Sequence, residues 1–164
     1  MTRDHPGLAI QDHYPPRFAH CFGCGPANPH GLHLKSYVVG DGTEARFTPD
    51  ARYSGGVPDN LYGGMIASLL DCHGTASAAA FAYRDRERKM GDGGLPIRFV
   101  TASLKIDYLK PTPIGEELLI TGKLTSIEGR RALIALSMSA NGVETARAEM
   151  VAVEARPVIA ATEP

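Results

Sequence analysis

The chain has 164 residues, of which 43% are hydrophobic and 21% charged, and its formal net charge at pH 7 is −1. This composition is typical of a soluble globular protein with one core, and the near-zero charge disfavours a nucleic acid or an anionic membrane as partner. Three cysteines do not make a disulfide framework, and no secretory apolar stretch opens the chain, so we expect a cytoplasmic protein.

Residues 1–31 contain five prolines and little periodicity, which predicts an irregular N-terminal arm lying over the domain. The first two strands are expected at 32–39 and 43–48, because Gly40-Asp-Gly42 between them favours a hairpin. We expect the domain to span residues 32–156, followed by a C-terminal tail at 157–164.

Residues 63–83 form a long apolar segment whose only carboxylate is Asp71, with no Lys or Arg. The apolar residues cover more than one face, which predicts a helix that is buried nearly all round rather than a transmembrane one. A lone carboxylate in such a helix is costly unless it has partners or a task. Asp71 is therefore the first candidate for function.

The charged, glycine-rich stretch 84–94 is expected to be an exposed connection. From residue 97 the pattern alternates with period two, so that even-numbered and odd-numbered residues are predicted to lie on opposite faces of a strand. The even face holds Val100, Ala102, Leu104, Ile106 and Tyr108, and the odd face Thr101, Ser103, Lys105 and Asp107.

Three further strands are expected at 118–127, 132–140 and 143–153, with tight turns at Glu128-Gly129 and Asn141-Gly142. Short turns imply antiparallel pairing. A helix that is apolar on most faces needs sheet around it. The sequence therefore predicts an α+β fold in which a curved antiparallel sheet of about six strands wraps around one long central helix.

Gly63 and Gly64 begin this helix, where free N–H groups and the helix dipole favour negative charge, including a developing oxyanion. From the dipeptide alone, a tight entry to a buried helix is the favoured interpretation. Asp71 follows Gly63 by eight residues, or roughly 12 Å along a helix. A catalytic group works at about 3 Å from its target. Either Asp71 is structural, or a site joins Gly63 of one subunit to Asp71 of another.

Two other patterns have weaker interpretations. The segment His20-Cys-Phe-Gly-Cys24, with His30 and His33, suggests zinc, but the spacing is short for a finger and packing of the arm is the favoured interpretation. Cys72 is expected to be an inert core thiol. Gly129-Arg-Arg131 at a hairpin tip is suited to phosphates, although a solvated turn is commoner. No metal and no cofactor are expected.

Three stretches resemble a known family. Asn60-Leu-Tyr-Gly-Gly-Met-Ile-Ala-Ser-Leu-Leu-Asp71 resembles the glycine-glycine to acid motif of hotdog-fold acyl-CoA thioesterases of the phenylacetate-degradation (PaaI-like) type. Residues 99–115, ending in Pro-Thr-Pro-Ile-Gly115, are similar to the long strand after the family's helix. Residues 21–32 resemble the opening of a subset of the family. The resemblance implies the fold already predicted, in a homodimer or dimer of dimers.

The resemblance also implies roles at a site between subunits. Gly63 would polarise the thioester carbonyl through its N–H, and the partner's Asp71 would act as nucleophile or as the base that activates water. Thr101 matches a position that orients water or the carboxylate, and Thr75 is the second candidate. The predicted substrate-binding residues are Asn60, Tyr62, Gly64, Arg130 and Arg131, with Tyr62 standing where the family usually has His.

These implications favour a thioesterase that hydrolyses an acyl-CoA to a free acid and CoA. One alternative is a hotdog hydratase or dehydratase, since Gly25-Pro-Ala-Asn-Pro-His30 nearly matches that group's loop but has Pro26 where the acid belongs. Another is a non-catalytic acyl-CoA-binding protein, which Tyr62 supports. The sequence leaves the acyl group open.

Overall fold

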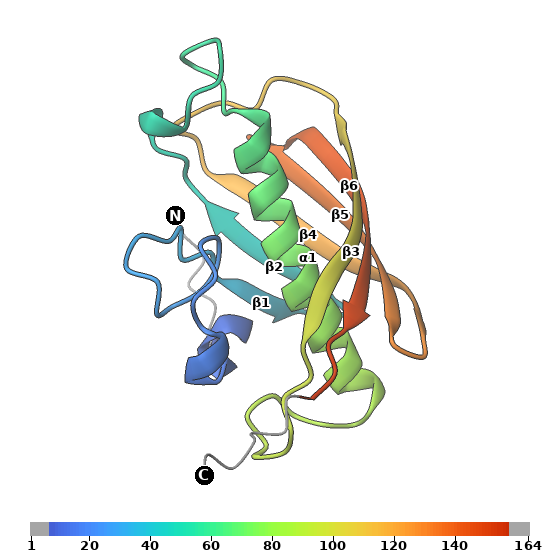
Figure 1. Cartoon of the computed structure of the whole chain (residues 1–164). Coiled ribbons are helices and arrows are strands. Elements are labelled where there is room, and N and C mark those ends of the chain that lie inside the picture. The colour runs from blue at the N-terminus through green and yellow to red at the C-terminus, as the bar shows by residue number, and fades with distance from the viewer. Residues whose placement is uncertain (1–6, 158–164) are drawn as a thin grey trace.

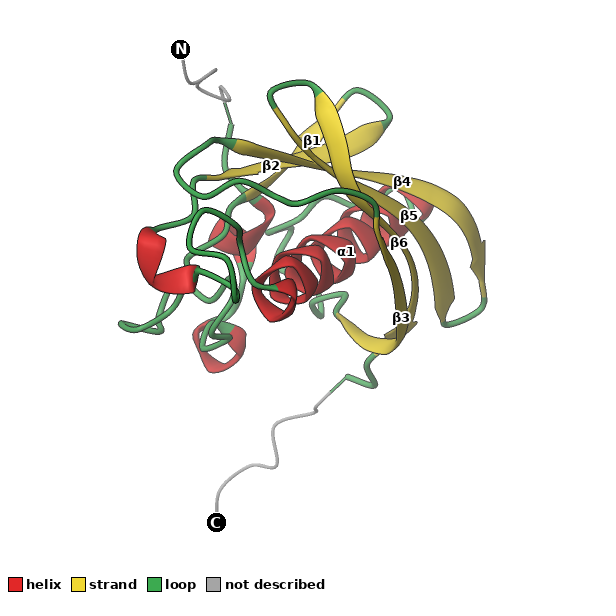
Figure 2. Cartoon of the chain, turned by 90° about the horizontal axis from the view of Figure 1, so that it is seen from above, coloured by secondary structure: helices red, strands yellow, loops and turns green. Residues whose placement is uncertain are grey.

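The structure, a computed structural model, describes residues 7–157 as one antiparallel six-stranded sheet that curves around a long helix, α1 (Gly63–Asp85) (Figures 1 and 2). This confirms the predicted α+β hotdog fold. The first six residues of the expected arm and residues 158–164 of the expected tail lie outside the described residues.

The sheet has the strand order β1-β2-β4-β5-β6-β3. Short hairpins join β1 to β2, β4 to β5 and β5 to β6, whereas β3 follows the helix and pairs with β6 at the edge (Figure 1). The strands are β1 (Ser36–Val39), β2 (Gly42–Phe47), β3 (Phe99–Tyr108), β4 (Leu118–Glu128), β5 (Arg131–Ala140) and β6 (Val143–Glu154).

The first strand begins later than predicted, at Ser36 instead of residue 32. The N–H groups of Leu32 and Leu34 donate to the carbonyls of Phe22 and Gly23 in the arm, at 2.7 and 3.0 Å. These backbone groups hold the arm against the domain and do not extend the β1–β2 ladder. The arm itself contains two short 3-10 helices, η1 (Ile10–His13) and η2 (Pro16–Phe18), and a third, η3 (Ala51–Tyr53), precedes α1.

The predicted tight turns are present between the last strands. Asn141 and Gly142 have φ angles of 50° and 75°, the left-handed pair that a two-residue hairpin requires. Gly129 also has a positive φ, of 60°, at the β4–β5 turn. Turn chemistry therefore sets the register in which β4, β5 and β6 present their alternating apolar side chains to the helix.

The core lies between α1 and the concave face of the sheet (Figure 2). The helix approaches β5 and β6 closely at Gly74, where a Cβ atom would stand 2.6 Å from the sulfur of Met150. Larger apolar side chains fill the space on either side of this contact. Those buried most completely include Leu69, Leu70, Phe81, Leu118, Ile120, Ile134, Met138 and Met150.

Residues 76–83 of the helix are buried all round, as its composition predicts, whereas the first half leaves one face partly exposed. Residues of one face keep partial or full exposure at a spacing of three or four: Gly64, Ala67, Ser68, Asp71 and Thr75. The sheet covers one side of α1 and the arm contributes Ile10 against Ala76 and Ala80. Within residues 7–157, no helix is long and apolar enough to cross a membrane.

Candidate functional site

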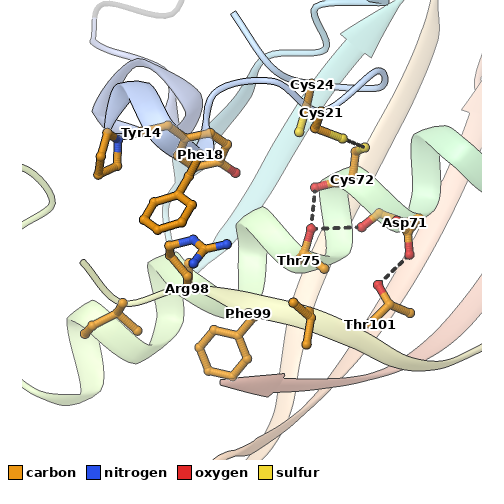
Figure 3. Close-up of a pocket in the computed structure, with 14 residues that line it drawn as sticks. Tyr14, Phe18, Cys21, Cys24, Asp71, Cys72, Thr75, Arg98, Phe99 and Thr101 are labelled. Carbon is orange, nitrogen blue, oxygen red and sulfur yellow. Dashed lines mark hydrogen bonds between the residues drawn. The ribbon is translucent and has the colours of Figure 1, made fainter. Parts of the chain in front are cut away.

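A pocket of about 340 Å³ opens beside Asp71, between α1, the arm and the start of β3 (Figure 3). The arm contributes Tyr14 and Phe18, and the approach to β3 contributes Ile97 and Phe99, so that most of the wall is apolar. A compact pocket with a few polar groups is the usual form of a small-molecule site. The polar side chains on its wall are Asp71, Thr75, Arg98 and Thr101, together with three cysteines.

Asp71 and Thr101 are brought together as the family resemblance implies. The Thr101 hydroxyl donates to Oδ1 of Asp71 at 2.5 Å (Figure 3). Among the described residues, Oδ2 of Asp71 accepts no hydrogen bond from another side chain. The carboxylate is thus held by one oxygen, and its second oxygen is available to a molecule in the pocket.

The unbroken alternation predicted for β3 is wrong at this point. In the pairing with β6, Thr101 is opposite Ala152 and Ser103 is opposite Val151, which leaves Ala102 as an extra residue in a bulge. Before the bulge Phe99 and Thr101 face the helix, and after it Leu104 and Ile106 pack on the core. A β-bulge re-aims side chains in this manner, and here it directs the Thr101 hydroxyl at Asp71.

Thr75 also lines the pocket, one helical turn after Asp71. Its hydroxyl donates back to the helix carbonyls of Asp71 and Cys72, at 3.2 Å each. In this arrangement the hydroxyl hydrogen is engaged by the backbone, while the oxygen lone pairs and the methyl group remain at the pocket wall. The site therefore has one hydroxyl bonded to the carboxylate and a second beside it.

The other end of the exposed helix face is formed by Gly63 and Gly64. Within the described chain, their N–H groups donate to no protein acceptor, as expected for a helix start. The Tyr108 hydroxyl donates to the Gly63 carbonyl at 3.1 Å. The Tyr62 ring lies over Gly64, where a Cβ atom would stand 2.3 Å from Cε2 of the ring.

Gly63 lines a different depression from the pocket that contains Asp71, together with Tyr108 and Leu109. One chain therefore does not bring Gly63 and Asp71 to a common cavity, in agreement with the separation of roughly 12 Å given by helix rise. A carbonyl in contact with the Asp71 carboxylate would need an oxyanion donor from elsewhere.

Three predicted substrate-binding residues lie away from the Asp71 pocket. Asn60 pairs through its backbone with Pro113, before the helix. The Arg130 guanidinium donates to the Glu154 carbonyl, and Arg131 lines a depression on β4, β5 and β6. The structure does not bring Asn60, Arg130 or Arg131 together with Asp71 in one chain.

Sequence reasoning did not single out Arg98, the cation that lines the pocket. Its guanidinium lies over the Phe18 ring, 3.4 Å from the centroid. Burial lowers the pKa of Arg98, and the neighbouring Arg17 also lowers it. A lone arginine before a strand gives no sequence signal, because its role depends on the arm folding over it.

The three cysteines gather at one wall of the pocket (Figure 3). The Sγ atoms of Cys21, Cys24 and Cys72 all lie within 4.8 Å of one another, and Cys21 and Cys72 are 3.7 Å apart. Hydrogen bonds from the Cys24 and Cys72 thiols lower the pKa of the Cys21 thiol, while the bond to Cys21 raises that of Cys72. Cys72 is thus a buried thiol with a raised pKa, which agrees with the expected inert core thiol, but it lies in contact with two other cysteines.

His73 lies on the opposite side of α1 in a buried chain of polar groups. Ser77 donates to the His73 carbonyl, so its oxygen accepts from Thr43, and the Thr43 oxygen accepts from Nε2 of His73. Nδ1 then accepts from Ser36, 2.9 Å away. This network assigns a neutral imidazole with its proton on Nε2, and burial lowers the pKa of His73 to about 4.

Comparisons with known proteins agree with this architecture. Residues 59–146 match the family model of the thioesterase superfamily. A thioesterase superfamily protein from Shewanella loihica PV-4 is 41% identical, with a TM-score of 0.62 over 79% of this chain and 97% of that one. The E. coli PaaI protein from the phenylacetic acid degradation operon shares the fold at 17% identity, with a TM-score of 0.58 over 74% of this chain and 83% of its own.

A curated relative is the acyl-coenzyme A thioesterase THEM4 of Rattus norvegicus, which is 29% identical over 97 residues. The match covers 59% of this chain but 36% of the rat protein, so the chain spans about a third of that relative's length.

Proposed function

The chain belongs to the thioesterase superfamily, and from this premise we propose that it hydrolyses an acyl-CoA thioester to a free acid and CoA. The observation that carries the proposal is the Asp71 carboxylate, held by Thr101 at the wall of a largely apolar pocket. Thioester hydrolysis needs a nucleophile or base beside an acyl pocket, and Asp71 occupies that position.

In the proposed reaction Thr101 fixes the Asp71 carboxylate through Oδ1 and leaves Oδ2 free to serve as base or nucleophile. Oδ2 either takes a proton from a water molecule that attacks the carbonyl carbon, or attacks that carbon itself. In both routes the carbonyl oxygen gains charge and the C–S bond breaks. When water attacks, the proton held by Asp71 passes to the departing sulfur, and the free acid and the CoA thiol are released. When Asp71 attacks, CoA leaves as the thiolate, and a water molecule then hydrolyses the acyl–Asp71 anhydride to the free acid and restores the carboxylate, with the proton released passing to the thiolate. Backbone N–H groups at a helix start are suited to stabilise such an oxyanion.

We propose that the oxyanion donor is Gly63 of a second copy of the chain. The exposed face of α1 runs from Gly64 to Asp71, with the small residues Ala67 and Ser68 midway. Two helices packed antiparallel about this midpoint would place the glycines of each beside Asp71 of the other. Small residues at the crossing allow the close approach that this requires.

The outer edge of the sheet supports the same assembly. β3 is an edge strand, and Val100, Tyr108 and Leu109 on and after it are 49%, 55% and 41% exposed. Exposed apolar groups on an unpaired edge are typical of an interface. A homodimer through this region would cover both α1 and β3, and a dimer of dimers would use a further surface.

The remaining predicted residues have positions in this proposal. The acyl group enters the pocket between Phe18 and Phe99, where Arg98 is available to an anionic group of the substrate. In this proposal, Tyr62 and Gly64 at the start of α1 in the second copy contact the thioester. Asn60 of that copy lies just before them in the chain. Arg130 and Arg131 stay candidates for the CoA phosphates at the outer surface.

Release of CoA from a panel of aromatic, short-chain and medium-chain acyl-CoAs, followed with a thiol reagent, tests the activity. We expect turnover of at least one member by the wild type and none by Asp71→Asn. Binding of acyl-CoA without release by the wild type would instead favour the non-catalytic protein that Tyr62 suggests.

The shared site is tested by mixing two inactive variants. Gly63→Pro removes the N–H at the first helical position, where proline is tolerated, and Tyr62 already has the extended φ and ψ of −72° and 146° that a following proline prefers. Oligomers holding one Gly63→Pro chain and one Asp71→Asn chain have one complete site of two, so we expect up to about half of wild-type activity. Inactive mixed oligomers would place the whole site within one chain.

A further inference from the structure

We propose that Cys21, Cys24 and Cys72 together bind one thiophilic metal ion, with zinc as the expected occupant, at the wall of the Asp71 pocket. Two ligands come from the arm and the third from α1, at the residue immediately after Asp71 (Figure 3). The site is separate from the hydrolytic reaction proposed above, and its test does not depend on that activity.

The sulfur positions match a tetrahedral metal site. With zinc–sulfur bonds of about 2.3 Å, two thiolates on one tetrahedral ion are roughly 3.8 Å apart. Cys21 and Cys72 are 3.7 Å apart, and all three sulfurs lie within 4.8 Å of one another. A disulfide would require a sulfur–sulfur distance of about 2.05 Å, so the three cysteines are free thiols, and their spacing is compatible with ligands of one ion.

The arm loop has a backbone conformation that lets the Cys72 thiol come close to Cys21 and Cys24. The Gly25 N–H donates to the Cys21 carbonyl at 2.8 Å, which closes a turn between the two arm cysteines. A Cβ atom at Gly23 would stand 2.3 Å from Sγ of Cys72, so a glycine is required there for the helix thiol to enter the loop. The Cys-x-x-Cys spacing is that of metal-binding pairs.

The three ligands are soft sulfur atoms, and one of them can be reached from solvent. Thiolates select zinc and similar ions over magnesium or calcium. Cys24 and Cys72 are 4% and 5% exposed, whereas Cys21 is exposed and provides the entry route. In the described part of the chain, no histidine or carboxylate joins the three sulfurs within 4.8 Å, which leaves the fourth position to solvent on the pocket side.

Such an ion would tie the arm to α1 beside Asp71. Tyr14 and Phe18, which line the pocket, belong to the same arm as Cys21 and Cys24. The metal would thereby fix the wall of the pocket, in addition to the backbone bonds that hold the arm at Leu32 and Leu34.

Metal content of the purified full-length protein, measured by elemental mass spectrometry after dialysis, is the first test. We expect about one zinc per chain in the wild type, since a three-thiolate site retains the ion. Cys24→Ser and Cys72→Ser should lose most of it. His30→Ala is the matched control, because it removes a ligand of the alternative finger that the sequence suggested, and should retain full zinc.

A second measurement needs no variant. Cobalt(II) added to the demetallated wild type should give a thiolate-to-cobalt charge-transfer band and the visible bands of tetrahedral cobalt. Bound zinc should slow alkylation of the exposed Cys21 by at least tenfold relative to the demetallated protein. A wild type with substoichiometric metal, no cobalt–thiolate band, or a Cys21–Cys72 disulfide in place of the metal would overturn the proposal.

Discussion

Asp71 and His73 are two residues apart on α1, yet the helix places them in opposite surroundings. Asp71 is half-buried at a pocket, bonded by the Thr101 hydroxyl at one oxygen and unpartnered within the described chain at the other. His73 is fully buried, with both ring nitrogens engaged by Ser36 and Thr43. Both are polar groups in an apolar helix.

The difference shows how a functional polar group is distinguished from a structural one. A buried polar group whose hydrogen bonds are all made stabilises one packing arrangement and has nothing left to offer a ligand. A polar group with a spare acceptor at an apolar pocket costs stability unless a ligand uses it. We therefore expect substitutions at Asp71 to affect activity and those at His73 to affect stability.

The largest effect is expected for Asp71→Asn. Loss of the base or nucleophile should lower kcat by about a thousandfold or more, equal to about 4 kcal/mol of barrier. Because the amide still accepts from Thr101, the melting temperature should stay close to that of the wild type. The matched control is Asp107→Asn on the exposed face of β3. A variant that lost activity and stability together would make Asp71 a structural residue like His73.

His73→Ala should show the opposite behaviour. It leaves a cavity and removes the partners of the Ser36 and Thr43 hydroxyls, for a loss of about 3 kcal/mol in the free energy of unfolding. Urea titration measures this loss, and kcat per folded molecule should change by less than about threefold because His73 does not line the pocket. A large fall in kcat with unchanged stability would contradict the structural role.

Acid should destabilise the protein through the same residue. The pKa of His73 is lowered by burial from 6.5 to about 4, so between these values the unfolded chain binds a proton that the folded one does not. The stability present above pH 6.5 should therefore fall by about 3 kcal/mol as pH decreases towards 4. Urea unfolding at pH 7 and pH 5 measures this loss. Between these pH values the free energy of unfolding should decrease less in His73→Gln than in the control His30→Gln, which changes an exposed histidine.

The smallest effect is expected for Thr101→Val, which keeps the side-chain shape and removes the hydroxyl. The carboxylate remains but loses its orienting bond, which should lower kcat by about tenfold, or about 1.4 kcal/mol. Ser103→Ala, on the other side of the bulge, is the control. An unchanged kcat in Thr101→Val would show that the hydroxyl is not required to position Asp71.

Local rules in the sequence predicted most of the fold. Asn141, Gly142 and Gly129 specified hairpins because these residue types tolerate left-handed backbone, and the long apolar run with a glycine pair specified α1. The start of β1 was misplaced, because the choice of Leu32 and Leu34 between strand and arm depends on carbonyls ten or more residues away. The helical rise over eight residues was enough to show that Gly63 and Asp71 of one chain are too far apart to act on the same carbonyl.

What the sequence by itself determined is the set of elements, their antiparallel connection and the position of Asp71, since these follow from periodicity, turn residues and helix rise. Only the tertiary structure decided which faces meet. The bulge at Ala102 turned Thr101 towards Asp71, and the folding of the arm brought Cys21 and Cys24 to Cys72. Both depend on contacts between residues distant in the chain, which no local pattern encodes.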